Sequence, residues 1–364
     1  VRRQLVSDRP LGVFLSGGID SSCILGIMSE ISSGPIKTFS VGYESDVQSE
    51  RYNADATLAA KTAKYFGAEH HAFTLTAKDS IATLEKIAWH MDEPISNHIQ
   101  SSTYLLAQYA KPYITVALGG DGGDELFGGY PRYWYSAFID RVRSLPIPFR
   151  NAILSFNPKF LTEQGLDRFI SFMMQKEAMV SSFLISTINH PNQARAAFAP
   201  YFDANWKDRI NKHMAVDVQT WLPDESLVRT DRLTMAHGLE ERVPLLDPDL
   251  VELAFRIPSK WKLGNKQQGK KIFIDAMRPY LPPHVLQEEK RAWLSPASKW
   301  IRGPMLPYMR EVLSSSFNSE TKEFFDFDAL SGILDNHVSS KTYALNTIWS
   351  VLTFQLWYRN LHKT

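Results

Sequence analysis

Residues 13–22 combine the end of an apolar run with a glycine loop and a helix start, and they read Val13-Phe14-Leu15-Ser16-Gly17-Gly18-Ile19-Asp20-Ser21-Ser22. A second stretch of this kind spans residues 114–130, where Ile-Thr-Val-Ala-Leu precedes Gly-Gly-Asp-Gly-Gly-Asp-Glu-Leu-Phe-Gly-Gly-Tyr. Ligands of open α/β sheets bind at the carboxyl ends of strands, where the winding of the sheet reverses direction. We therefore expect the two strands that end in these loops to be neighbours in one sheet.

The residues around these stretches alternate between strand and helix patterns. Residues 13–15, 38–41, 71–75 and 114–118 are short apolar, β-rich runs. Residues 54–66 and 81–91 each place apolar side chains on one helical face. Strands separated by helices predict an α/β fold, with a parallel sheet covered by helices on both faces.

From about residue 137 the pattern becomes mostly helical and rich in Phe, Met, Leu and Trp. We predict two regions: residues 1–136 form the α/β core, and residues 137–364 form a helical layer packed on that core. No repeat and no low-complexity linker separates them.

Composition excludes several classes of protein. The 364 residues are 44% hydrophobic, which suits a globular chain with a sizeable core. Lys and Arg number 40 against 39 Asp and Glu, so the net charge of +1 gives no basic surface for nucleic acid. No apolar run is long enough for a membrane span, and no signal-peptide pattern is visible. The single cysteine, Cys23, excludes a disulfide framework within the chain and fits a reducing cytoplasm.

The first loop has the composition of a phosphate cradle. Glycines allow a tight turn whose N–H groups, together with the following helix N-terminus, bind anions. The lysine of the pattern G-x-x-x-x-G-K-S/T is absent, so the loop suits a leaving pyrophosphate better than γ-phosphoryl transfer. Asp20 is then a candidate Mg²⁺ ligand. The competing interpretation is a plain glycine turn capped by Asp20 and Ser21.

The second loop gathers negative charge among glycines, with Asp121, Asp124 and Glu125 in one short run. Carboxylates beside a phosphate site repel the ligand unless a divalent cation lies between them. The two loops together therefore predict a site for magnesium-bound ATP. A solvated turn, the competing interpretation, would not need this many glycines.

A third segment, residues 229–247, interleaves charged and apolar residues. Its charged residues are Asp231, Arg232, Glu240, Glu241 and Arg242. Long charged side chains in an otherwise apolar element usually pair with one another, so we favour a structural ion-pair network over substrate contact.

These segments match motifs of a known family. Residues 16–21 resemble the pyrophosphate loop S-G-G-x-D-S of the N-type ATP pyrophosphatases, and residues 120–130 resemble the second signature of the asparagine synthetases. Residues 231–247 resemble a third signature, D-R/K-x-x-M-x-x-S-x-E-x-R-V-P-F-L-D, and residues 290–296 a weaker fourth, K-x-G-F-x-x-P. The motifs occur in family order. The chain thus resembles the C-terminal synthetase domain of the glutamine-hydrolysing asparagine synthetases, which implies an adenine nucleotide alpha-hydrolase-like fold.

The resemblance implies a set of site residues. It assigns ATP binding to Leu15, Ser16, Gly17, Gly18, Asp20, Ser21, Val41, Gly119 and Gly120. Asp20 and Asp124 match the Mg²⁺ ligands. Asp121 matches the acidic residue implicated in forming the adenylate and in accepting protons from the amine, and Lys290 matches a lysine that neutralises charge during adenylation.

The implied reaction is ATP-dependent amidation of a carboxylate through an acyl-adenylate, with aspartate converted to asparagine and AMP and pyrophosphate released. Residues 137–364 would supply the acyl-substrate side, and a homodimer is compatible with the family. Glutamine-dependent members carry an N-terminal glutaminase domain with a cysteine at the chain start. Because Cys23 follows the phosphate loop instead, we expect that domain to be absent from this chain, which would be a piece of a longer protein or would use free ammonia.

Several departures keep the acid substrate open. Gly119 stands where the family often has serine, and Asp121 is one methylene shorter than the glutamate often found. Gly238 replaces a serine and Leu245 a phenylalanine. The alternatives are relatives with the same adenylation chemistry, such as β-lactam synthetases, lasso-peptide cyclases and enzymes that amidate sugar acids. A tRNA-modifying relative is disfavoured by the net charge, and a non-catalytic scaffold by the presence of Asp20, Asp121 and Asp124 together.

Overall fold

The computed structural model describes residues 1–44, 49–149, 164–186, 188, 190, 192–202, 205–264, 269–291 and 293–362. Ala292, inside the fourth motif, lies outside the described residues. The strands are β1 (Leu11–Phe14), β2 (Lys37–Tyr43), β3 (Glu69–Leu75), β4 (Val116–Leu118) and β5 (Glu240–Arg242). The α-helices in the first part of the chain are α1 (Ile19–Ile31), α2 (Ser49–Tyr65), α3 (Ala77–His90), α4 (Gln100–Ala110), α5 (Gly123–Phe127) and α6 (Pro131–Arg143).

The remaining described chain is almost entirely helical. Its α-helices are α9 (Gly165–Met173), α10 (Glu177–Ser181), α11 (Gln193–Phe202), α12 (Arg209–Gln219), α13 (Val228–Met235), α14 (Pro248–Arg256), α15 (Ser259–Lys262), α16 (Lys271–Met277), α17 (Pro283–Gln287), α18 (Ala297–Ile301), α19 (Leu306–Val312), α20 (Phe327–Val338) and α21 (Leu345–Leu361). Short tighter or wider helical turns are η1 (Arg2–Leu5), η2 (Leu222–Leu227), η3 (Pro244–Leu246), η4 (Arg278–Tyr280) and η5 (Ser319–Glu323). Within these described ranges, no helix combines the length and apolarity needed to cross a membrane.

The sheet has five parallel strands in the order β3-β2-β1-β4-β5. In this order Val13 of β1 pairs with Thr38 of β2 on one side and with Leu118 of β4 on the other. The chain therefore winds in one direction from β1 to β3 and then returns to place β4 on the opposite side of β1. This confirms the predicted neighbourhood of the two strands that end in glycine loops.

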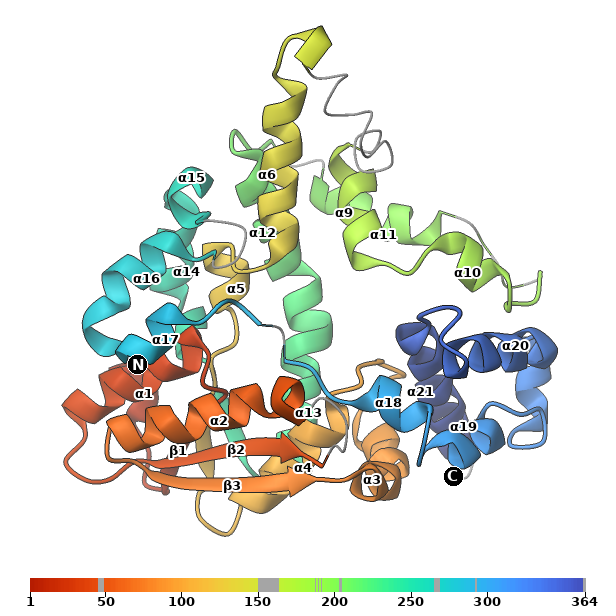
Figure 1. The fold of residues 1–364 in the computed structure, drawn as a ribbon, viewed down its shortest axis with the longest axis horizontal. Coiled ribbons are helices and arrows are strands. Elements are labelled where there is room, and N and C mark those ends of the chain that lie inside the picture. Colours follow the sequence, from red (N-terminus) through yellow and green to blue (C-terminus); the bar gives the residue numbers. More distant parts are fainter. Residues whose placement is uncertain are drawn as a thin grey trace.

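Helices cover both faces of the sheet, as predicted (Figure 1). Val13 faces α1 and α2, and packs in one core cluster with Ile24 of α1 and Ala59 of α2. On the opposite face, Phe39 of β2 packs against Leu106 of α4. This division follows from the pleat, because successive strand side chains point to opposite faces.

One strand was not predicted. Strand β5 reads Glu-Glu-Arg and has none of the apolar character that marks a buried strand. It pairs with β4 because the open edge of β4 offers unpaired backbone groups: the Glu240 N–H donates to Thr115 O over 2.9 Å, and the Gly119 N–H donates to Arg242 O over 2.8 Å. Charged side chains are typical of such an edge strand. The sheet thus takes its last strand from the second half of the sequence.

The C-terminal helices form a cluster of their own beside α3. Helices α18 to α21 gather at one end of the molecule (Figure 1), where Trp349 of α21, Met305 and Leu84 of α3 belong to one buried cluster. Elsewhere α6 and α12 are joined by buried charge: Asp217 of α12 accepts hydrogen bonds from Arg132 Nη2 at 2.9 Å and from the Tyr133 hydroxyl. The second half therefore packs around the sheet and also contributes to it.

Candidate active site

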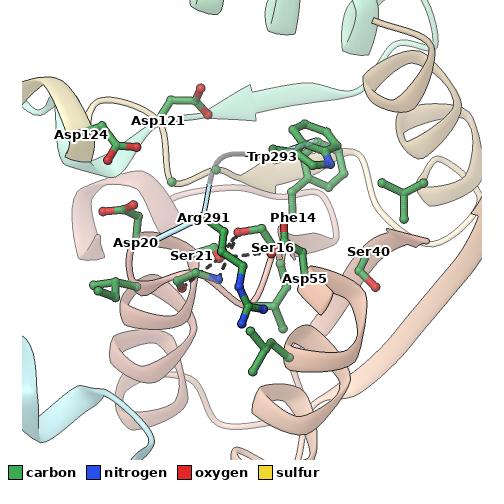
Figure 2. Close-up of a pocket in the computed structure, with 18 of the residues that line it drawn as sticks. Phe14, Ser16, Asp20, Ser21, Ser40, Asp55, Asp121, Asp124, Arg291 and Trp293 are labelled. Carbon is green, nitrogen blue, oxygen red and sulfur yellow. Dashed lines mark hydrogen bonds between the residues drawn. The ribbon is translucent and has the colours of Figure 1, made fainter. Parts of the chain in front are cut away.

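A cavity of about 290 Å³ opens where β1, β2 and β4 end, and Figure 2 shows the residues that line it. It gathers every residue that the sequence analysis assigned to the site. These are Leu15, Ser16, Gly17, Gly18, Asp20, Ser21, Val41, Gly119, Gly120, Asp121, Asp124 and Lys290. Their convergence follows from the strand order, because the carboxyl ends of neighbouring parallel strands meet at one edge of the sheet.

The first loop leaves backbone donors open at the start of α1. Gly18 is the N-cap residue of this helix and offers no side chain to its first N–H groups. The loop is held instead by its serines: the Ser16 N–H donates to Ser21 Oγ over 3.2 Å, and the two hydroxyl oxygens lie 3.0 Å apart (Figure 2). Uncapped N–H groups and the helix dipole favour an anion at this point.

The second loop approaches the first because it carries glycines. A Cβ added to Gly123 would lie 2.2 Å from Asp20 Oδ1, and one added to Gly120 would lie 2.9 Å from Asp20 Cβ. A side chain at Gly120 would meet Asp20 Cβ and the backbone nitrogen of Ser21 and push the loops apart, and one at Gly123 would displace the Asp20 carboxylate. The glycines therefore bring Asp20 and Asp124 to one cavity.

A lysine that the sequence analysis missed joins these two aspartates. Lys270, only 1% exposed, places its Nζ 2.5 Å from Asp20 Oδ2 and 2.9 Å from Asp124 Oδ1. Lys290 Nζ donates to Asp124 Oδ2 over 2.7 Å. Burial alone would raise the pKa of Asp124, but the charges of Lys270 and Lys290 outweigh it and hold that pKa well below its usual range. Burial would likewise lower the pKa of Lys270, whereas Asp124 and Asp20 raise it.

The two aspartates fit a divalent cation. Asp20 Oδ1 is buried without a hydrogen-bond partner among the described residues, and Asp124 Oδ1 meets Lys270 only as an ion pair. In the described part of the chain no group of three or more His, Cys, Asp or Glu side chains could hold a metal by itself. Mg²⁺ is usually held by one or two carboxylates together with substrate phosphates and water, so a pair beside a phosphate loop suits it.

The far end of the cavity is acidic. Ser226 Oγ donates to Asp121 Oδ1 over 3.2 Å, and the Glu241 carboxyl donates to Asp121. Burial is the main cause that raises the pKa of Asp121, and burial together with the charge of Asp121 raises the pKa of Glu241 well above its usual value. Arg229 also lines this end, with its Nε donating to Glu225 Oε1 over 2.7 Å.

The third motif therefore divides between two roles. Arg242 pairs with Glu240 at 2.7 Å, as predicted, whereas Arg232 pairs with Asp92, which lies outside the segment, at 2.5 Å. Glu241 departs from that expectation because the pleat of β5 turns it into the cavity, away from its two neighbours. Because all three residues of β5 are charged, the sequence shows no alternation of apolar and polar residues from which the inward-facing residue could be predicted.

A hydrogen-bonded pair within the second motif, Tyr130 and Glu125, was also not predicted from the sequence. The Tyr130 hydroxyl donates to Glu125 Oε1 over 2.7 Å, and both residues line the cavity. Burial, followed by the charge of Asp124, raises the pKa of Glu125 to about 7. The Arg132 guanidinium lies 4.0 Å from the centre of the Tyr130 ring.

Cys23 has the structural role that its position suggested. The side chain is 1% exposed on α1 and packs in the core beside β1. Burial raises the pKa of its thiol to about 12, which disfavours the thiolate that a nucleophilic cysteine requires.

Comparisons with known proteins identify a family for this sequence. The sequence matches the family described as asparagine synthase over residues 1–359. It is 32% identical to asparagine synthetase [glutamine-hydrolyzing] 1 of Bacillus subtilis, over 98% of this chain and 57% of that protein. It is 29% identical to a putative glutamine-hydrolyzing asparagine synthetase of Mycobacterium bovis, over 98% and 56%. A Gibberella zeae protein named amidase chry2 is 25% identical, over 97% and 59%.

The chain spans somewhat more than half the length of these relatives, yet almost all of its own residues are matched. The matched residues include both glycine loops, β5 and the segment that carries Lys290. By this match, the chain belongs to the asparagine synthase family.

Proposed function

We propose that this protein uses ATP and Mg²⁺ to activate a carboxylate as its acyl-adenylate and then transfers the acyl group to nitrogen, converting aspartate to asparagine with release of AMP and pyrophosphate. One observation carries the proposal: in a chain of this family, the uncapped start of α1 faces the same cavity as Asp20 and Asp124. A pyrophosphate cradle and a carboxylate pair are the two parts that magnesium-bound ATP needs.

Each residue then has a defined task. The N–H groups at the start of α1, directly after the loop of residues 16–18, bind the phosphates that leave as pyrophosphate. Asp20 and Asp124 hold the Mg²⁺, which when bound neutralises phosphate charge. Lys290, already at the carboxylate pair, adds positive charge where the transition state gains negative charge. Asp121 accepts a proton from the nitrogen that attacks the acyl group.

The source of nitrogen is proposed from the relatives, which are longer than this chain. The relatives named above are called glutamine-hydrolyzing, and the chain covers only 57% and 56% of them. We propose that nitrogen arrives as ammonia, either free or released from glutamine by a part of the protein outside this sequence.

A second candidate keeps the chemistry and changes the acid. Asp121 stands where the family often has glutamate, and it lies at the end of the cavity that is left for the acyl substrate. The shorter carboxylate at this position suits an enzyme of this family that activates a carboxylate other than aspartate.

Exchange of labelled pyrophosphate into ATP tests the proposal, because only reversible adenylation supports it. We expect exchange that requires both Mg²⁺ and aspartate, and asparagine formation when ammonium is added. Asp20→Asn should abolish the exchange, whereas Asp249→Asn, at a 76% exposed side chain, should not. Exchange with another acid in place of aspartate would favour the second candidate. Absence of exchange with every acid tried would refute adenylation.

A further inference from the structure

We call the end of the cavity at β4 and β5, which is left for the acyl substrate, the acyl end. It contains a carboxyl group that the proposed reaction does not use. Of the three residues of β5, Glu240 and Arg242 pair with each other at 2.7 Å away from the cavity, and Glu241 alone lines it. Glu241 forms a hydrogen bond with Asp121, so two carboxyl groups meet at this point.

The fold reserves space for this carboxyl group. A Cβ added to Gly119 would lie 1.9 Å from Glu241 Oε1 and 3.2 Å from Asp121 Oδ2. The Glu241 carboxyl group therefore occupies the place where a Cβ at position 119 would lie. A side chain at position 119 would move the end of the Glu241 side chain from this place.

Arg229 is the cation that acts on both carboxyl groups of this pair, and its charge lowers the pKa of each. Arg229 is 5% exposed and also pairs with a third carboxylate, Glu225, through Nε at 2.7 Å. Ser226 provides a neutral hydrogen bond to Asp121. Asp121 and Glu241 are half-buried, line the cavity and share Arg229 with Glu225, so the pair is suited to a positively charged ligand group.

The position of Asp121 and Glu241 in the sheet indicates which ligand carries the positively charged group. The phosphate loop follows β1, and Val41 belongs to β2, on one side of β1; Asp121 and Glu241 belong to β4 and β5 on the other. Phosphates would be repelled by two carboxyl groups. The acyl substrate is therefore the ligand part that reaches them.

We propose that Glu241, together with Asp121, binds a protonated amino group of the acyl substrate, so that the enzyme selects an amino acid over the corresponding acid without nitrogen. The inference rests on the proposed adenylation and names the substrate class and a specificity residue for it. An ammonium group placed between the carboxyl groups supplies a second positive charge beside that of Arg229 and up to three hydrogen-bond donors.

Pyrophosphate exchange with two acids tests this directly. Aspartate and succinate differ only by the amino group, and the exchange needs no nitrogen donor. We expect wild-type kcat/KM to be at least about a hundredfold higher for aspartate, in line with about 3 kcal/mol for a charge-assisted contact. Glu241→Gln should lower the value for aspartate about tenfold or more and leave that for succinate within about twofold. Glu240→Gln, one residue away on the outer side of β5, is the matched control and should change neither.

A second experiment compares Gly119→Ala in the wild type and in the Glu241→Ala variant. It tests whether a side chain at position 119 and the Glu241 carboxyl group compete for one space. Gly119→Ala should reduce exchange strongly in the wild-type background, where its methyl group would strike Glu241, but by less than about twofold when Glu241→Ala is already present. Equal losses in both backgrounds would contradict the spatial argument. Far-UV circular dichroism and the midpoint of thermal unfolding verify that each variant is folded.

The outcomes separate this inference from the proposed function. No exchange with any acid in the wild type would refute the adenylation itself. Exchange with aspartate but an unchanged aspartate-to-succinate ratio in Glu241→Gln would overturn only the assignment of Glu241. A Glu241→Gln defect confined to the ammonium-dependent formation of amide would also overturn it, because Glu241 would then serve the nitrogen donor.

Discussion

Lys270 and Asp20, separated by 250 positions in the sequence, meet at 2.5 Å between Nζ and Oδ2 at the centre of the candidate site. The same ammonium group lies 2.9 Å from Asp124 Oδ1, so one buried cation bridges both proposed magnesium ligands, and Lys290 adds a second cation at Asp124. These pairings offset the repulsion between the two carboxylates. A metal ion bound by Asp20 and Asp124 would therefore contact the same two carboxylates as Lys270.

Replacing this lysine should destabilise the protein in a metal-dependent way. Lys270→Met leaves two half-buried carboxylates without their shared cation, while Lys290 still pairs with Asp124. Loss of one partner of a buried ion pair costs about 3–5 kcal/mol, and the lower end of this range is expected here. We expect that loss in the free energy of unfolding, measured with urea in EDTA. Millimolar Mg²⁺ should restore more stability to the variant than to the wild type. Lys271→Met is the control, because its exposed pair with Asp275 should contribute no more than about 1 kcal/mol. Equal stability of Lys270→Met and wild type would contradict the prediction.

The loop after β1, which we propose binds phosphate, should not accept any side chain at Gly17. This glycine has φ of +74°, and a Cβ would lie 2.6 Å from Leu58 Cβ and 2.7 Å from the backbone nitrogen of Ala59. Gly17→Ala should therefore displace the loop from α2, raising the KM for ATP by at least about tenfold and lowering the free energy of unfolding. Gly67→Ala separates the two causes, since Gly67 also has positive φ, of +64°, but nothing within 4 Å. It should lose only the roughly 1–2 kcal/mol of a left-handed residue and keep the wild-type KM.

The junction of α6 and α12 should depend on one buried carboxylate. Asp217 is fully buried and accepts from Arg132 and Tyr133. Asp217→Ala leaves the Arg132 guanidinium, 18% exposed, without its partner, so the free energy of unfolding should fall by about 3–5 kcal/mol. Asp249→Ala removes a pair at the surface with Arg3 and should change stability by less than about 1 kcal/mol. Urea unfolding of both variants checks the contrast; similar small losses would show that Asp217 is not a structural residue.

Acid should destabilise the protein partly through His213. Burial, followed by the charge of Arg168, lowers the pKa of this histidine to about 4, below its ordinary value of 6.5. Its contribution to stability is therefore present above pH 6.5 and is lost as the pH falls toward 4, because only the unfolded chain takes up the proton in this range. His213→Phe should keep the ring contacts with Phe169 and Phe202 and remove the titration.

The measurement is the free energy of unfolding of both proteins from pH 7.5 to pH 4.5. Between pH 6.5 and pH 4.5 the wild type should lose about 2–3 kcal/mol more than His213→Phe, at about 1.4 kcal/mol per pH unit. Above pH 7 the difference between the two proteins should be constant. Parallel curves over the whole range would show that His213 takes up its proton equally in both states.

The two glycine loops of the candidate site could be predicted from the sequence, whereas two side chains that reach the site from distant elements could not. The loops at residues 16–21 and 119–130 could be assigned from sequence because glycine, serine and aspartate at close spacing have few other uses beside a buried strand. Their meeting in one cavity followed from the strand order. Lys270 and Glu241 could not be assigned, since a lysine after a glycine and a glutamate between two charged residues have no local pattern that marks them.

The sequence by itself determined the alternation of strands and helices, the two glycine-bearing strand ends and the family, because hydrophobic period and residue type act over a few neighbouring positions. Only the tertiary structure decided that β5 joins the edge of β4, that Lys270 neutralises Asp20 and Asp124, and that Glu241 uses the space left by Gly119. These contacts join residues more than a hundred positions apart. They depend on how whole elements pack, and on which buried charges then have to be compensated.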